Sequence, residues 1–213
     1  MISHQLKERN ALHQHFGSVM PNLADNFDDL IRLSFADGAL SAQIKELIAL
    51  GISVSVRCEP CMHYHIVKAR QKGASDAELL EAMTVGFEMG AGVLKPPLGK
   101  ALSAIFPTGD KRASHLRSMM PDLADNFDDL MQLTFAAGAL PAQVKELIAL
   151  AISVSLRCEP CMNYHAEQAR QTGASDAELL ETMTVGFEMG VGALIPPLRT
   201  ILKACFPAGG DQA

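Results

Sequence analysis

The sequence contains no tryptophan, only two tyrosines and no long uninterrupted hydrophobic run. Its longest apolar stretch, Leu47 to Val56, is broken by glycine and serine. That stretch is shorter than the ~20 residues that a membrane-spanning helix needs. The polar N-terminal residues include no apolar core of signal-peptide length. We therefore expect a soluble, cytoplasmic protein that does not associate with a membrane.

Positive charge is also scarce. Eighteen Lys and Arg residues face 24 Asp and Glu residues, the formal net charge is −6, and no basic cluster occurs. Nucleic acids and anionic surfaces attract cationic faces, so we expect no nucleic-acid partner. Only five cysteines are present. In the cytoplasm, paired cysteines indicate metal binding or redox chemistry more often than structural disulfides.

What the sequence does contain is a tandem repeat at an offset of 100 residues. Cys58-Glu59-Pro60-Cys61 recurs as Cys158-Glu159-Pro160-Cys161, and most positions from 20 to 107 are identical in the second copy. A period of this length exceeds the ~20–50 residues of stacked solenoid repeats. We predict two domains, residues 1–107 and 108–213. Because the copies are so similar, a residue's presence in both is weak evidence of function.

Each repeat shows helical periodicity. Leu23, Phe27, Leu30 and Ile31 follow the i, i+4, i+7, i+8 spacing of an amphipathic helix. The segment 42–56 is apolar nearly all round, as expected of a helix in a core or an interface. Residues 52–56 alternate in polarity and could form a strand, but the length of the whole segment favours a helix. The predicted fold class is all-α, with about five to six helices per repeat.

Further signals define the later helices. Pro60 suits the first turn of a helix that ends before Gly73. Ser75 and Glu78 have the spacing of a capping box at the start of the next helix. Gly86 and Gly90 lie on one stripe of that helix, which would allow close helix packing, for instance between subunits.

The chemistry-bearing residues are Cys58, Cys61 and His65, at positions i, i+3 and i+7 of one helix. At 3.6 residues per turn these three side chains share one face. Cys61 and His65 are close enough for the imidazole to take the thiol proton. A dithiol at a helix start is biased toward the reactive thiolate by the helix dipole. Together these groups could reduce a peroxide, because one thiolate attacks and the second thiol resolves the sulfenic acid.

Glu46 is the further candidate. If the chain turns back near Arg57, His65 comes opposite residue 49, within one turn of Glu46. A carboxylate there could orient the imidazole and draw its proton. The alternative is a surface ion pair, since Lys45 precedes it. The second repeat carries the same set of residues, Glu146, Cys158, Cys161 and His165.

These residues give the chain a family resemblance. Glu46, eleven intervening residues and then Cys58-x-x-Cys61-x-x-x-His65 resemble the signature of AhpD-like alkylhydroperoxidases, in the carboxymuconolactone decarboxylase superfamily. The resemblance implies that the cysteine nearer the histidine attacks the peroxide, while the earlier one resolves. By the same resemblance glutamate and histidine form a proton relay. The implied roles are as follows: Cys61 and Cys161 attack, Cys58 and Cys158 resolve, and Glu46–His65 and Glu146–His165 are the relays.

The resemblance also implies an all-α homo-oligomer, with a trimer of tandem chains favoured. We expect no cofactor and no bound metal. The expected partners are a peroxide substrate and a dithiol reductant such as a lipoyl or thioredoxin-like protein. AhpD has a second histidine directly before the later cysteine, where this chain has Pro60 and Pro160.

Two other functions stay open from the residues alone. A lyase of the decarboxylase type could use Glu46 and His65 without thiol turnover. A non-enzymatic module could use the cysteines to bind zinc, with Glu46 or a water completing the site, or to sense redox state.

Overall fold

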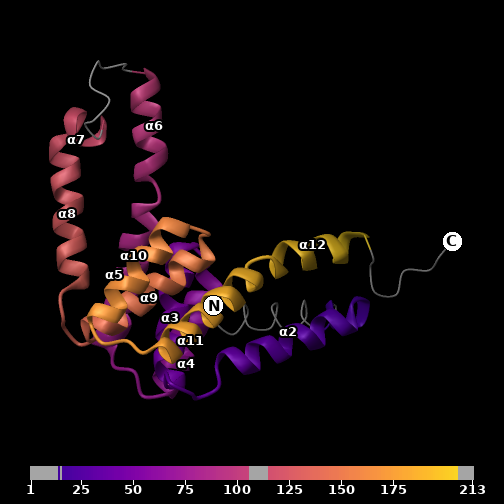
Figure 1. The fold of residues 1–213 in the computed structure, drawn as a ribbon. Helices are drawn as coiled ribbons and strands as arrows, with labels where there is room; N and C mark the ends of the chain where they lie inside the picture. Colours follow the sequence, from indigo (N-terminus) through magenta and orange to yellow (C-terminus); the bar gives the residue numbers. More distant parts are fainter. Residues whose placement is uncertain (1–13, 15, 106–114, 206–213) are drawn as a thin grey trace.

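The computed structural model describes residue 14 and residues 16–105 and 115–205. Every regular element in these ranges is a helix, which confirms the predicted all-α class (Figure 1). The first repeat contributes α2 (Pro21–Ser34), α3 (Ala42–Ser55), α4 (Glu59–Gln71), α5 (Asp76–Gly92) and α6 (Lys95–Ile105). The second contributes α7 (His115–Met119), α8 (Pro121–Phe135), α9 (Ala142–Ser155), α10 (Glu159–Gln171), α11 (Asp176–Gly192) and α12 (Ile195–Cys205).

The centre of the molecule is formed by α3, α5, α9 and α11, which contact one another across the two repeats. On α3, Leu47, Ile48, Leu50 and Ile52 are completely buried, as are their counterparts on α9. Burying a large aliphatic side chain contributes about 1.5–3 kcal/mol, so this shared core is the main source of stability. The helix prediction for residues 42–56 is confirmed, and the strand alternative for residues 52–56 is wrong.

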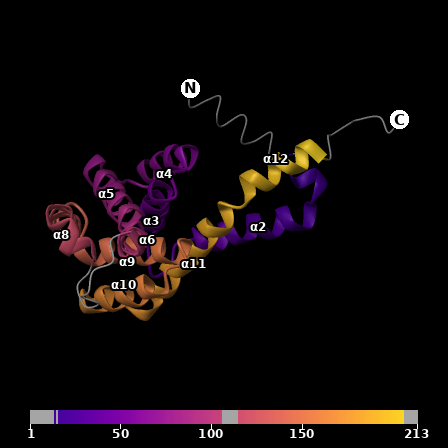
Figure 2. The same ribbon diagram turned by 90° about the horizontal axis from the view of Figure 1, so that it is seen from above.

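The repeats exchange their first long helices. Helix α2 of the first repeat packs against α11 of the second, and α8 of the second packs against α5 of the first. Two arms project from the centre as a result, one made of α6, α7 and α8 and the other of α2 and α12 (Figures 1 and 2). The predicted boundary between residues 107 and 108 lies outside the described residues, and the division into two domains stays a prediction.

Two carboxylates join the repeats at equivalent places. Glu181 accepts hydrogen bonds from the backbone amides of Ala39 (2.8 Å) and Leu40 (2.9 Å) and pairs with Lys45 at 2.9 Å. Glu81 does the same for the equivalent amides and lysine of the second repeat. A Cβ on Gly38 would lie 2.2 Å from the Glu181 carboxylate. The sequence therefore needs glycine here so that Glu181 can reach the loop before α3.

The glycine stripe of α5 packs inside the repeat. A Cβ at Gly86 would lie 2.3 Å from the carbonyl oxygen of Gly51 on α3, and one at Gly90 would lie 3.3 Å from the Cα of Ser55. The predicted close helix packing is confirmed, but it joins α5 to α3 rather than two subunits. The capping box of Ser75 and Glu78 is also present.

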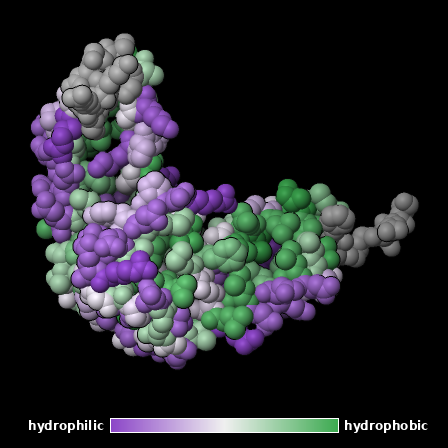
Figure 3. Space-filling view, viewed as in Figure 1, coloured by the Kyte–Doolittle hydropathy of each residue, from purple (hydrophilic) through white to green (hydrophobic). Residues whose placement is uncertain are grey.

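Within the described part of the chain, one segment, Asp176–Cys205, is long and apolar enough to span a membrane by length and composition. Its apolar residues have another explanation, because α11 packs on α9 and α3 and buries Leu179 and Val185. The chain also turns between α11 and α12. Hydrophobic surface remains over α11 and α12 (Figure 3), where Leu180, Phe187 and Ile201 are exposed.

Candidate functional site

The site is built on the hairpin of α3 and α4. Helix α3 ends at Ser55, and Arg57 then adopts a left-handed conformation with φ of 59°. Such a conformation costs a non-glycine residue about 1 kcal/mol and is concentrated at functional sites. The turn is closed by the amide of Cys58, which donates to the carbonyl of Ser53 at 2.9 Å. The chain thus reverses at Arg57, as the sequence predicts.

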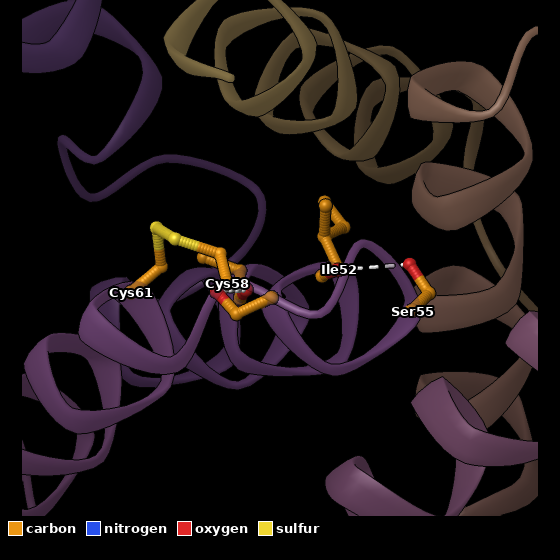
Figure 4. The surroundings of a disulfide bond; sticks show 6 residues. Ile52, Ser55, Cys58 and Cys61 are labelled. Atoms are coloured by element: carbon orange, nitrogen blue, oxygen red, sulfur yellow. Dashed lines mark hydrogen bonds between the residues drawn. A yellow bond between two sulfur atoms is a disulfide. The ribbon is translucent and has the colours of Figure 1, made fainter. Parts of the chain in front are cut away.

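Cys58 and Cys61 form a disulfide at the start of α4 (Figure 4). Cys58 is the N-cap residue, and Pro60 occupies the first turn. Both cysteines are half-buried, so a small substrate or a partner's thiol can approach the sulfur atoms. In the reduced state the helix N-terminus favours the thiolate form, which is the nucleophile in thiol chemistry.

The second part of the site is a hydrogen bond between the histidine and the glutamate. His65 Nδ1 lies 2.8 Å from Glu46 Oε2, and both side chains are buried. This is the contact that the hairpin argument predicts. Glu46 accepts the Nδ1–H hydrogen bond, which leaves Nε2 as the nitrogen that can take a proton. A buried carboxylate is expensive to desolvate, and the histidine is its compensating partner.

Lys45, although adjacent in sequence, is not the partner of Glu46. Its ammonium pairs with Glu181 and donates to the carbonyl oxygen of Ala36 at 2.5 Å. Consecutive helical residues point about 100° apart, so the two side chains leave α3 in different directions. The surface-ion-pair alternative for Glu46 is therefore wrong.

Two aromatic residues that the sequence reasoning missed contact the histidine. Phe35, the C-cap residue of α2, stacks on His65 with ring centroids 5.8 Å apart. Tyr64 meets the same ring edge-on at 5.0 Å. These contacts restrict the imidazole to one plane. Phe35 lies eleven residues before Glu46 outside any motif, so only the tertiary packing identifies it.

Two buried carboxyls were also missed. Glu88 on α5 and Glu188 on α11 are each 4% exposed. Burial and the charge of Glu46 raise the pKa of Glu188 to about 7. Burial also raises the pKa of Glu88, an effect that His165 and Lys95 partly offset. The available signal was a single acidic residue in an otherwise apolar turn, Val85 to Met89.

The second repeat has the same geometry. Cys158 and Cys161 form a disulfide, and His165 Nδ1 lies 2.8 Å from Glu146 Oε2. Phe135 stacks on His165 at 5.6 Å. In both repeats the structure thus joins the two cysteines to each other and the glutamate to the histidine.

The residues suit acid–base and thiol chemistry better than a metal. Within residues 16–105 and 115–205, no group of three or more His, Cys, Asp and Glu side chains is arranged to hold a metal ion. A zinc site of the usual kind needs four ligands. The cysteines are joined to each other in disulfides, so they could ligate zinc only after reduction.

Comparison with known proteins agrees with this arrangement. The profile of the carboxymuconolactone decarboxylase family matches residues 21–94 and again residues 121–198. The chain is 36% identical over 84 residues to uncharacterized protein 4 in the cox locus of Paracoccus denitrificans, covering 39% of this chain and 76% of that protein. It is 36% identical over 99 residues to an uncharacterized protein of Cupriavidus necator, covering 46% of this chain and 88% of that protein.

Among solved structures, a protein of Burkholderia xenovorans has the same fold. It is described as a proposed gamma-carboxymuconolactone decarboxylase subunit. The superposition has a TM-score of 0.63 at 19% identity and covers 96% of this chain and 98% of that one.

Proposed function

The chain belongs to the carboxymuconolactone decarboxylase family, and we propose that each of its two sites is a thiol-dependent peroxidase or disulfide reductase of the alkylhydroperoxidase type. One observation carries the proposal. A Cys-x-x-Cys pair at a helix start lies one turn from a histidine that is bonded to a buried carboxylate. Acid–base chemistry alone would need only the histidine and the carboxylate. The dithiol adds a group that can be oxidised and reduced.

In the proposed cycle the reduced site first forms a thiolate. Nε2 of His65 takes the Cys61 proton, and Glu46 stabilises the resulting imidazolium. The Cys61 thiolate attacks the terminal oxygen of a hydroperoxide, the O–O bond breaks, and Cys61 becomes a sulfenic acid. The departing alkoxide receives the proton from His65 and leaves as an alcohol.

The second half of the cycle closes the disulfide. The Cys58 thiol attacks the sulfenic sulfur of Cys61, and the hydroxyl leaves as water with the thiol proton. The peroxide has then gained two electrons, and the dithiol has lost two. A dithiol reductant returns the site to its starting state through a mixed disulfide. The same exchange without peroxide would be a disulfide reductase reaction.

We propose a lipoyl or thioredoxin-like protein as the reductant and the cytoplasm as the compartment. We also propose a homo-oligomer, with a trimer favoured. Exposed apolar side chains on α5 and α11, such as Leu80, Phe87 and Phe187, support an oligomer. Large exposed apolar patches are uncommon on monomers.

The second candidate is a lyase of the decarboxylase type. Its support is the name of the family and the description of the Burkholderia xenovorans protein as a decarboxylase subunit. In this reaction the buried Glu46–His65 pair would transfer a proton at a carbon centre, and the cysteines would not turn over.

Replacement of the attacking cysteines distinguishes the two candidates. In the double variant Cys61→Ser/Cys161→Ser, turnover of an organic hydroperoxide with a dithiol reductant should fall to background. A matched variant, Cys205→Ser, removes the exposed cysteine at the end of α12 and should keep full activity. Hydroperoxide turnover that survives in the double variant contradicts a thiol peroxidase.

A further inference from the structure

The buried carboxyls Glu88 and Glu188 are not used by the proposed cycle. Each is 4% exposed, and the Oε2 atom of each has no hydrogen-bond partner among the described residues. A buried polar atom without a partner is destabilising. A glutamine or leucine could fill the same space without an ionisable group, so packing alone does not explain a carboxyl.

Each carboxyl lies on a helix that packs against the opposite repeat. Glu188 projects from α11, which packs against α2 and against α3, the helix of Glu46. A Cβ on Gly192 would lie 3.7 Å from Glu188 Oε1 and 3.6 Å from the ring of Phe27, so the carboxyl lies close to α2. Glu88 lies equivalently close to α8, since a Cβ on Gly92 would lie 3.9 Å from Glu88 Oε1 and 3.5 Å from the ring of Phe127.

The charges that act on each carboxyl lie mainly in the opposite repeat. After burial, the influence that raises the pKa of Glu188 is the charge of Glu46, in the other repeat. For Glu88, burial raises the pKa, His165 and Lys95 lower it, and Glu146 raises it. The Coulomb interaction between two charges weakens as their separation grows. Each carboxyl is therefore within electrostatic reach of the relay that belongs to the other repeat.

Few other charges compete for these two groups. The charged residues of α2 are exposed. The other buried charged side chains of the described residues have contacts of their own. Lys45 pairs with Glu181, Lys145 with Glu81 and Glu146 with His165, and Arg199 lies over the Phe16 ring.

We propose that Glu188 is a positioning residue for the Glu46–His65 pair, and Glu88 for the Glu146–His165 pair. With the glutamate and histidine of the other repeat, each carboxyl forms a cluster of three ionisable groups whose protonation is coupled. The proposal rests on the relay role of the Glu–His pairs in the proposed function. It makes each site composite, because the protonation of its histidine depends on a residue of the other repeat.

One substitution between the repeats changes the charge near the two carboxyls. Lys95 stands at the start of α6, where the second repeat has Ile195. Lys95 favours the ionised form of Glu88, whereas Ile195 carries no charge and is buried with Phe16 and Leu202. Glu188 should therefore hold its proton to a higher pH than Glu88. In the first-repeat site, Glu188 should lose its proton near pH 7.

The test follows the ring resonances of the two histidines by NMR as the pH changes, which needs no enzymatic turnover. Glu188 should ionise near pH 7, and the negative charge that then appears beside the Glu46–His65 pair should move the ring resonances of His65. Glu188→Gln should remove this change and leave the ring resonances of His165 unaffected. Glu88→Gln should do the converse, so each variant controls for the other.

Lys95→Ile supplies an independent variant at a half-exposed position. It should move the Glu88-dependent change in the His165 ring resonances to higher pH. If Glu188→Gln folds normally and leaves the pH dependence of the His65 ring resonances unchanged, the proposal is overturned. If the protein lacks peroxidase activity but shows these changes, the proposed function is overturned and the coupling of the three groups stands.

Discussion

The carboxylate of Glu181 lies 2.9 Å from the ammonium nitrogen of Lys45, and the two residues belong to different repeats. Lys45 directly precedes Glu46, whose carboxylate instead accepts a hydrogen bond from His65. Neighbouring residues of one helix thus have separate tasks. One joins the repeats, and the other is part of the site.

Removal of the inter-repeat carboxylate should destabilise the whole molecule. Glu181→Ala removes the carboxylate that pairs with the buried ammonium of Lys45 and the acceptor of two backbone amides. We expect a loss of about 3 kcal/mol in the free energy of unfolding, the lower end for breaking a buried pair, because Glu181 keeps partial exposure. Urea unfolding measures this loss. Glu178→Ala removes the capping box at the start of the same helix and the long hydrogen bonds from Gln143. It should cost about 1 kcal/mol and is the matched control.

Stability should also fall in acid. Burial raises the pKa of Glu81 and of Glu181, but hydrogen bonds from backbone amides and the paired lysine lower it by more, so the net pKa is below 4.5. A carboxyl whose pKa is lowered by folding stabilises the protein above its unfolded pKa and loses this effect as pH falls through its folded pKa. Unfolding measured from pH 6 to pH 3 should show a decline below about pH 4.5. Glu81→Gln/Glu181→Gln should decline less, and an equal decline would contradict the assignment.

The charge of the relay carboxylate should matter more than its shape. Glutamine at position 46 can still accept the hydrogen bond from His65 Nδ1, but it cannot stabilise an imidazolium. We expect Glu46→Gln/Glu146→Gln to lower the hydroperoxide rate by about 100-fold, in the range for general acid–base groups. The single variant should keep about half of the activity, because the other site is intact. A double variant with the original rate would exclude these carboxylates from the chemistry.

Close packing of α5 on α3 should tolerate no side chain at its centre. In Gly86→Ala the added Cβ would lie 2.3 Å from a backbone oxygen of Gly51, and backbone cannot move aside as a side chain can. Overpacking of this kind costs about 1–3 kcal/mol. Gly99→Ala on α6 meets nothing within 4 Å and should be neutral or slightly stabilising. Thermal unfolding of both variants measures the difference, and equal melting temperatures would contradict the packing argument.

Local signals in the sequence were sufficient for the hairpin and its contents. Helix periodicity and the turn at Arg57 placed His65 within reach of Glu46, because a hairpin of two helices fixes which residues lie opposite. The capping box at Ser75 was equally local. Each of these predictions used residues of one repeat and one or two helices.

What the sequence did not reveal depends on contacts between helices that are distant in the sequence. Phe35 follows the last residue of α2 and stacks on His65 of α4. Glu188 is influenced by the charge of Glu46 because α11 packs against α3 of the other repeat. The glycine stripe on α5 predicted close packing but not its partner. Spacing along one helix carries no information about which distant helix will lie against it.

The most direct test is a count of thiols in the reduced, metal-free protein after one equivalent of organic hydroperoxide per site. Intact mass after alkylation should show the loss of four thiols. Peptide mapping should locate two disulfides, Cys58–Cys61 and Cys158–Cys161, with Cys205 still alkylated. The change should be fast and reversed by a dithiol. If all five thiols remain alkylated after the peroxide is added, the thiol peroxidase account is contradicted.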